Sequence, residues 1–160
     1  LGDFLKGIIA CSLTHIILGQ LGIGDAYMFV LYTGLGVVLG HNFPFYMQFK
    51  GGKGIAASGG MIVGLWDWRL VVILLAAFII SVVITRYVSV GSLTIMIGFF
   101  ILYTVFAIHG DYNFTSNAKM IEGIIMAGII AGMAVIRHWQ NIKRLIAGTE
   151  NKLSFGSKKA

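Results

Sequence analysis

Apolar residues dominate six segments of this chain, and polar residues gather in the short stretches between them. The apolar segments are 7–23, 26–40, 54–66, 70–85, 88–108 and 120–136. The fourth, "LVVILLAAFIISVVIT", has no polar face, which a soluble helix would need to meet water. The pattern therefore predicts an all-α fold, a polytopic membrane helix bundle with about six transmembrane helices.

Segment length separates the six predicted helices. A membrane-spanning helix needs about 20 residues, and about 17 is the lower limit. Only segment 88–108 is comfortably long by itself, so the others must borrow flanking residues or tilt. Segment 54–66, "GIAASGGMIVGLW", is short and rich in small residues, which favours a helix buried in protein. A re-entrant segment is the alternative.

The composition agrees with a membrane protein. Hydrophobic residues make up 58% of the 160 residues and charged residues 11%, unlike a typical soluble domain. A net charge of +6 would suit nucleic acid, but the charges lie at the ends of apolar segments, so no nucleic-acid partner is predicted. With one cysteine, Cys11, and no His or carboxylate cluster of ligand spacing, no intrachain disulfide, metal or cofactor is predicted.

The basic residues predict the orientation of the bundle. If all six segments span, the connections alternate between two sides, and the side with more Lys and Arg faces the cytoplasm. One side carries ten of the twelve basic residues, namely Lys6, Lys50, Lys53, Arg86, Arg137, Lys143, Arg144, Lys152, Lys158 and Lys159. Both ends of the chain then lie in the cytoplasm. Residues 1–136 form the transmembrane domain with its cytoplasmic loops, and residues 137–160 an interfacial helix and basic tail.

The loop "FKGGKG" carries the clearest sign of chemistry on that side. Gly51, Gly52 and Gly54 permit positive φ angles and close backbone approach, and a helix is predicted to begin directly after them. The N-terminus of a helix is an anion site, to which Lys50 and Lys53 add charges suited to phosphate. The spacing is not that of a nucleotide P-loop, which needs Ser or Thr after the lysine. The alternative is a flexible loop whose lysines follow the topology rule.

Further polar residues are predicted on the same side. Each is either part of the same site or has an ordinary structural role. His41 and Asn42 end a predicted helix, and Arg86 is either an anion ligand or a topology marker. Ser89 and Ser92 are suited to capping a helix or bonding a carbonyl one turn back.

The stretch "RHWQNIKRLIAG" predicts an amphipathic helix in the membrane interface. His138 and Asn141 are three residues apart, so they share one face of that helix. Gly148 can end the helix in a left-handed turn. A plain membrane anchor is the alternative.

Taken together, these motifs resemble a known family. The bacterial PlsY family, the acyl-phosphate:glycerol-3-phosphate acyltransferases of the inner membrane, is similar in "GHNFPFYMQFKGGKGIA", "RHWQNIKRLIAGTE", "DFLKG" and "RYVSVGS", over essentially the whole chain. The resemblance implies a seven-helix inner-membrane enzyme with its active site facing the cytoplasm. It would transfer a fatty acyl group from acyl phosphate to the 1-hydroxyl of glycerol 3-phosphate, giving lysophosphatidic acid for phospholipid biosynthesis.

The resemblance also implies roles for single residues. Glu150 would be structural, and the partners would be glycerol 3-phosphate, acyl phosphate and membrane lipids, with no cofactor. The catalytic residues would be His138, Asn141, Ser89 and Ser92. The substrate phosphate would bind at His41, Asn42, Lys50, Gly51, Gly52, Lys53, Gly54 and Arg86.

One departure from the family stands out. Its members begin with another transmembrane helix and a cytoplasmic loop with an essential serine and arginine, and nothing here matches them. We therefore expect an N-terminally truncated member, six helices of seven, with little or no activity by itself. The alternative functions are a membrane transporter or channel for an anionic metabolite and a non-catalytic lipid-binding scaffold.

Overall fold

The computed structural model describes residues 1–154, and within them every regular element is helical. The elements are α1 (Gly2–Gln20), α2 (Ala26–Asn42), the 3-10 turn η1 (Phe45–Met47), α3 (Ile55–Gly64), α4 (Trp68–Thr85), α5 (Val88–His109), α6 (Asn117–Arg137) and α7 (Trp139–Ile146). The all-α fold predicted from the apolar segments is confirmed. Lys158 and Lys159 of the predicted basic tail lie outside the described residues.

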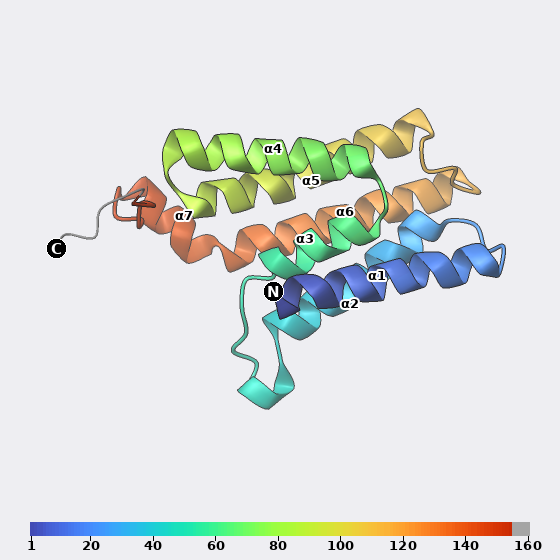
Figure 1. The fold of residues 1–160 in the computed structure, drawn as a ribbon, viewed down its shortest axis with the longest axis horizontal. Coiled ribbons are helices and arrows are strands. Elements are labelled where there is room, and N and C mark those ends of the chain that lie inside the picture. The colour runs from blue at the N-terminus through green and yellow to red at the C-terminus, as the bar shows by residue number, and fades with distance from the viewer. Residues whose placement is uncertain (155–160) are drawn as a thin grey trace.

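The long helices run side by side along the longest axis of the molecule (Figure 1). Short connections make sequential helices antiparallel neighbours, as in other helix bundles. Helix α1 packs against α2 and α3, and α5 packs between α4 and α6. The connection containing η1 projects sideways from the bundle, and α7 covers one end of it (Figure 1). We call this the α7 end.

Five helices of the described chain are long and apolar enough to cross a membrane, not six. The exception is α3, which has 10 residues. At 1.5 Å per residue it extends about 15 Å, half the hydrocarbon thickness of a bilayer. The chain turns after α3 at Trp66, whose φ is 60°, and Asp67 caps α4 by accepting from the N–H of Arg69. The prediction of six apolar helices holds, but α3 is too short to span as one helix.

Small residues bring α3 against α1. A Cβ atom on Gly60 would lie 2.1 Å from the carbonyl oxygen of Phe4, and one on Gly7 would lie 2.5 Å from that of Ala57. Both distances are well inside van der Waals contact, so only glycine fits at either position. The glycine-rich composition of this segment therefore serves close helix packing, as predicted for a helix buried in protein.

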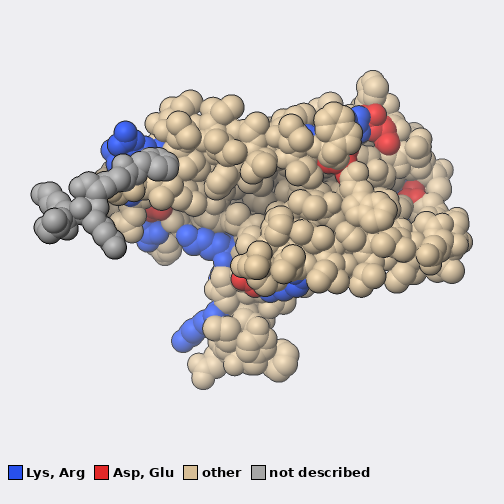
Figure 2. Space-filling model, viewed as in Figure 1, with Lys and Arg blue, Asp and Glu red and all other residues tan. Residues whose placement is uncertain are grey.

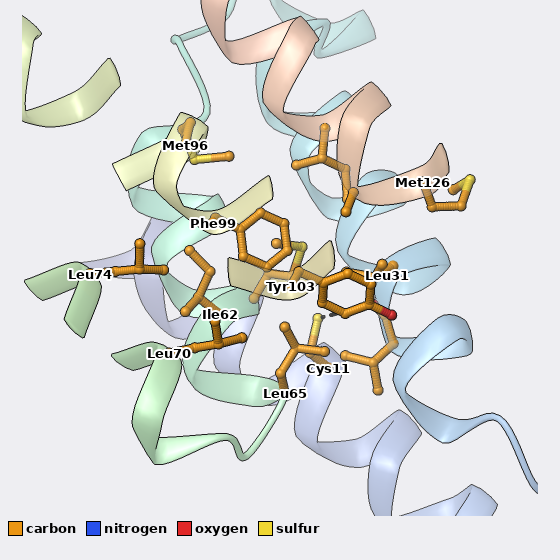
Figure 3. Packing of buried hydrophobic residues seen from close by; sticks show 14 of the residues in the cluster. Cys11, Leu31, Ile62, Leu65, Leu70, Leu74, Met96, Phe99, Tyr103 and Met126 are labelled. Carbon is orange, nitrogen blue, oxygen red and sulfur yellow. Dashed lines mark hydrogen bonds between the residues drawn. The ribbon is translucent and has the colours of Figure 1, made fainter. Parts of the chain in front are cut away.

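The core and the outer surface are both apolar, which is typical of a membrane protein. Inside, Leu70, Phe99 and Tyr103 are fully buried where α3, α4, α5 and α6 meet (Figure 3). Cys11 is buried among them as a packing residue. Outside, residues such as Ile84, 76% exposed, cover the helices where a soluble protein would carry polar side chains.

Charges separate along the bundle. Lysine and arginine side chains gather around the α7 end and the connection beside it, and acidic side chains are prominent toward the opposite end (Figure 2). Among residues 1–154, the basic residues that the sequence predicted to share one side therefore gather toward one end of the structure. This end also holds the glycine-lysine loop, residues 50–54.

Candidate active site

An open pocket of about 320 Å³ lies at the α7 end. The first turn of α5, helix α7 and the chain that follows it come together here beside Lys53. The lining residues are Lys53, Val88, Ser89, Ser92, Asn141, Glu150, Asn151, Lys152 and Leu153. Five residues that the motifs predicted for the site are thus brought together from three separate stretches of sequence.

Glu150 organises one wall of this pocket. Its Oε1 accepts hydrogen bonds from Asn141 Nδ2 at 2.7 Å and from Ser89 Oγ at 2.9 Å, and its Oε2 accepts from Arg144 Nε at 2.7 Å. The hydrogen bond from Arg144, followed by that from Asn141, lowers the pKa of Glu150 to about 2. The ionised carboxylate therefore ties α5 to α7 and fixes the side chains of Ser89 and Asn141.

His138 lies at the junction of α6 and α7, with 2% of its surface exposed. Its Nδ1 is 2.8 Å from the carbonyl oxygen of Ala134, and a carbonyl only accepts, so Nδ1 carries the hydrogen. Burial is the main cause that lowers the pKa of His138, and the charge of Lys53 lowers it further. The hydrogen bond with the Ala134 carbonyl and the charge of Glu150 oppose them, but the net shift is downward. His138 is therefore neutral near pH 7, with the lone pair on Nε2.

Several buried polar atoms around this end have no hydrogen-bond partner among residues 1–154. They are both amide atoms of Asn42, Oγ of Ser58 and Oδ1 of Asn141. Asn42 lies against Gly54, because a Cβ atom there would be 2.8 Å from its Oδ1. Buried polar groups are nearly always paired in folded proteins. Such a group of unpaired atoms beside a cationic loop is typical of a site that a polar ligand completes.

The two glycines before Lys53 are fixed by the end of α2. The N–H of Gly51 donates to the carbonyl oxygen of Asn42 at 3.2 Å, and the N–H of Gly52 to that of His41 at 3.3 Å. A Cβ atom on Gly52 would lie 2.2 Å from the His41 ring. These N–H groups are occupied within the protein. They are therefore not free to donate to a ligand in this structure, and the phosphate contacts expected of this loop stay a prediction.

Several predicted residues do not line the Lys53 pocket, His41, Lys50 and Arg86 among them. His41 Nδ1 is 3.1 Å from Asp3 Oδ1, and His41 and Lys50 line a separate pocket of about 430 Å³ on the other side of the loop. Arg86 ends α4 with a φ of 62°, and its carbonyl oxygen accepts from the N–H of Leu153 at 2.7 Å. Its side chain is exposed. The structure thus gives Arg86 a backbone role in holding the chain after Glu150.

The sequence model of one protein family, described as Glycerol-3-phosphate acyltransferase, matches residues 1–148. The chain belongs to this family. A glycerol-3-phosphate acyltransferase of Thermoanaerobacter sp. (strain X514) is 38% identical over 151 residues, which are 94% of this chain and 67% of that protein. One of Coxiella burnetii (strain CbuG_Q212) is 37% identical over 153 residues, 96% of this chain and 69% of that protein. The chain thus spans about two thirds of their length.

Solved structures of the acyltransferase PlsY agree in fold. The crystal structure of PlsY, an integral membrane glycerol 3-phosphate acyltransferase, in its lysophosphatidic acid form matches with a TM-score of 0.75 and 31% identity, over 95% of this chain and 69% of that one. The glycerol 3-phosphate form matches with the same TM-score. The family predicted from the motifs is confirmed, and the chain is a multi-pass integral membrane protein of an acyltransferase family.

Sequence reasoning did not select three residues at this candidate site. Arg144 is the charged partner of Glu150, and Ser58 lies one turn into α3. Arg137 donates to the carbonyl oxygens of Gly51 and Gly52. A signal existed for Arg137, which directly precedes the histidine of the recognised motif, but its basic charge had been assigned to membrane topology alone.

Proposed function

We propose that the protein transfers a fatty acyl group from acyl phosphate to the 1-hydroxyl of glycerol 3-phosphate, giving lysophosphatidic acid. The observation that carries the proposal is the pocket that Lys53, Ser89 and Asn141 line in a member of the acyltransferase family. The buried His138 lies close enough for the charge of Lys53 to contribute to its lowered pKa. The PlsY structures in the glycerol 3-phosphate and lysophosphatidic acid forms support it.

The phosphate of glycerol 3-phosphate binds at Lys53 and the start of α3. The first N–H groups of a helix have no partner within the helix, and the dipole makes this end positive. Gly54 caps α3 with a φ of 82°, a conformation that glycine adopts without strain. Lys53 lines the pocket, so its ammonium group adds a full charge beside these N–H groups.

The acyl transfer itself requires little of the protein. Acyl phosphate is a mixed anhydride, so the 1-hydroxyl oxygen attacks the acyl carbon, the bond to the phosphate oxygen breaks, and phosphate leaves. The hydroxyl proton passes to Nε2 of His138 or to the departing phosphate. Positioning of the two substrates supplies much of the rate. Because the donor is already activated, this reaction needs no cofactor.

The serines take supporting roles in this proposal. Ser89 Oγ donates to Glu150, and Ser92 Oγ donates to the carbonyl oxygen of Val88 at 3.0 Å. Neither hydroxyl is paired with a histidine in the described residues, so a covalent acyl-serine intermediate has no support. Ser89 and Ser92 line the pocket and orient the substrate together with Asn141.

The pocket faces the cytoplasm of a bacterium, with the chain in the inner membrane. The support is the gathering of basic side chains at the α7 end (Figure 2), because positive residues stay on the cytoplasmic side. Both ends of the described chain would lie there. Helix α3 begins on the same side and packs against α1 and α2.

An acyltransferase assay in membranes tests the proposal. Membranes carrying this chain, or this chain extended by the upstream helix and loop that the family resemblance predicts, receive labelled glycerol 3-phosphate with palmitoyl phosphate or palmitoyl-CoA. We expect lysophosphatidic acid from palmitoyl phosphate, lost in Lys53→Ala and retained in Lys143→Ala. Absence of product from both chains, together with uptake of glycerol 3-phosphate into liposomes, would favour the transporter instead.

A further inference from the structure

Arg137, the last residue of α6, makes an unusual set of contacts. Its Nη2 donates to the carbonyl oxygens of Gly51 and Gly52, both at 2.8 Å, and its Nε donates to that of Gly52 at 3.1 Å. The guanidinium also lies over the ring of Phe43, 5.2 Å from its centroid. Within residues 1–154 no carboxylate pairs with it, so two peptide carbonyls are its polar partners.

These contacts complete a clamp on the glycine-lysine loop. The end of α2 accepts the N–H groups of Gly51 and Gly52, and Arg137 of α6 holds their carbonyl oxygens. Each of the two glycines is thus bonded through both its N–H and its C=O. Two glycines in sequence are otherwise the most mobile backbone in a protein. The clamp removes that freedom directly before Lys53 and the start of α3.

Arg137 and His138 are consecutive residues at the end of α6, which links the clamp to the candidate active site. Arg137 reaches the glycine carbonyls, and the next residue, His138, lies within electrostatic reach of Lys53 and Glu150. One helix end therefore places the histidine and, through the loop, the lysine. A change in the loop would move Lys53 relative to His138 without altering either side chain.

We propose that Arg137 is a positioning residue that fixes Lys53 and the N-terminus of α3 for the substrate phosphate. This inference rests on the proposed acyltransferase function. Arginine suits the task because its planar fork reaches two carbonyl oxygens at once, whereas lysine offers one compact charge. Arg137 orders the glycine-lysine loop and does not contact the acyl donor. Its loss should therefore weaken the binding of glycerol 3-phosphate.

The experiment compares Arg137→Ala and Arg137→Lys with Lys143→Ala, which removes a nearby exposed cation that makes no contact with the loop. Steady-state kinetics give the KM for glycerol 3-phosphate and for palmitoyl phosphate separately. We expect Arg137→Ala to raise the KM for glycerol 3-phosphate by about tenfold to a hundredfold, since hydrogen bonds from a charged donor are lost. The KM for palmitoyl phosphate changes little. The KM of Arg137→Lys for glycerol 3-phosphate lies between those of the wild type and Arg137→Ala. Guanidinium added to the assay lowers the KM of Arg137→Ala part of the way to the wild-type value.

Hydrogen–deuterium exchange provides a readout that does not depend on activity. In Arg137→Ala the amides of residues 50–54 exchange faster, those of α5 keep their protection as a check on folding, and Lys143→Ala matches the wild type. Equal KM changes in Arg137→Ala and Lys143→Ala, or unchanged loop exchange, would overturn the proposal. If even the wild type forms no product, the acyltransferase function fails, and faster loop exchange would still establish the clamp. If Arg137→Ala does not fold, Arg137→Lys carries the same comparisons.

Discussion

The two ends of the bundle use polar residues in opposite ways. Away from the α7 end, Arg69 donates to Asp67 at 2.9 Å and to Asp111 at 3.2 Å, and the hydroxyl of Tyr112 donates to Asp67. Burial raises the pKa of Asp67, but the hydrogen bonds from Arg69 outweigh it and the net shift is downward. Every member of this cluster has a partner within the protein.

At the α7 end, the polar groups are only partly paired. Glu150 has three donors, but Lys53 has no hydrogen-bond partner in the described chain, and neither do the amide of Asn42 and the Oδ1 of Asn141. A paired cluster stabilises the fold by itself, whereas unpaired groups gain partners only when something binds. The difference separates a structural cluster from a binding site, although both contain conspicuous charges.

The largest expected effect comes from removing the unpaired cation. Lys53→Ala should lower kcat/KM for glycerol 3-phosphate by about a hundredfold or more, because a charged ligand of the phosphate is lost. The melting temperature in detergent should stay within error, since Lys53 has no hydrogen-bond partner to lose among residues 1–154. Enzyme kinetics with a thermal melt of the same preparation checks both. A marked fall in melting temperature would place Lys53 with the structural residues.

The converse change removes the hub of the paired cluster. Asp67→Ala deletes the cap of α4, two contacts with Arg69 and one with Tyr112. We expect the free energy of unfolding to fall by about 2 kcal/mol. The kcat/KM of the folded fraction should be unchanged, because the cluster is far from Lys53. Denaturant unfolding in detergent and active-site kinetics measure the two quantities, and lost activity without lost stability would break the comparison.

The fold was largely predictable because apolar segments specify helices directly. The structure departs from the prediction at α3, where hydropathy identified a helix but not how far that helix extends. Its length is set by the turn at Trp66 and the cap at Asp67, and its position by glycine contacts with α1. Such contacts depend on which helix lies opposite, which a single sequence does not display.

For the candidate site, motifs identified residue types but not their partners. Ser89, Asn141 and Glu150 meet in one hydrogen-bond network although they come from distant positions. Lys50, only three residues before Lys53 in sequence, lines a different pocket together with His41. Proximity along the chain therefore misjudges proximity in space.

The third prediction concerns pH and separates His138 from an ordinary histidine. Because burial lowers its pKa, His138 stays neutral as the pH falls past 6.5, and activity that needs a neutral histidine is lost only at a lower pH. The acid limb of the kcat/KM profile should therefore lie below pH 6.5 and disappear in the residual activity of His138→Asn. An acid limb at or above pH 6.5, or one unchanged in the variant, would exclude His138 as its source.

The smallest effect is a change in the pH dependence of stability. The pKa of Glu150 falls from 4.5 to about 2 on folding, so its contribution is fully present above pH 4.5 and is lost as the pH falls toward 2. The side chain in Glu150→Gln has a similar shape but carries no charge to pair with Arg144. We expect a slightly lower melting temperature at pH 7 and a shallower loss of stability between pH 4.5 and 2 than in the wild type.

Arg144→Gln provides the matched control for that prediction. Removing the cation takes away the main cause of the lowered pKa and leaves the carboxylate with Ser89 and Asn141. Its acid transition should lie between those of the wild type and Glu150→Gln. If all three proteins lose stability along the same curve, other carboxylates govern acid unfolding. Glu150 would then hold Ser89 and Asn141 in place through hydrogen-bond geometry, with its charge contributing little.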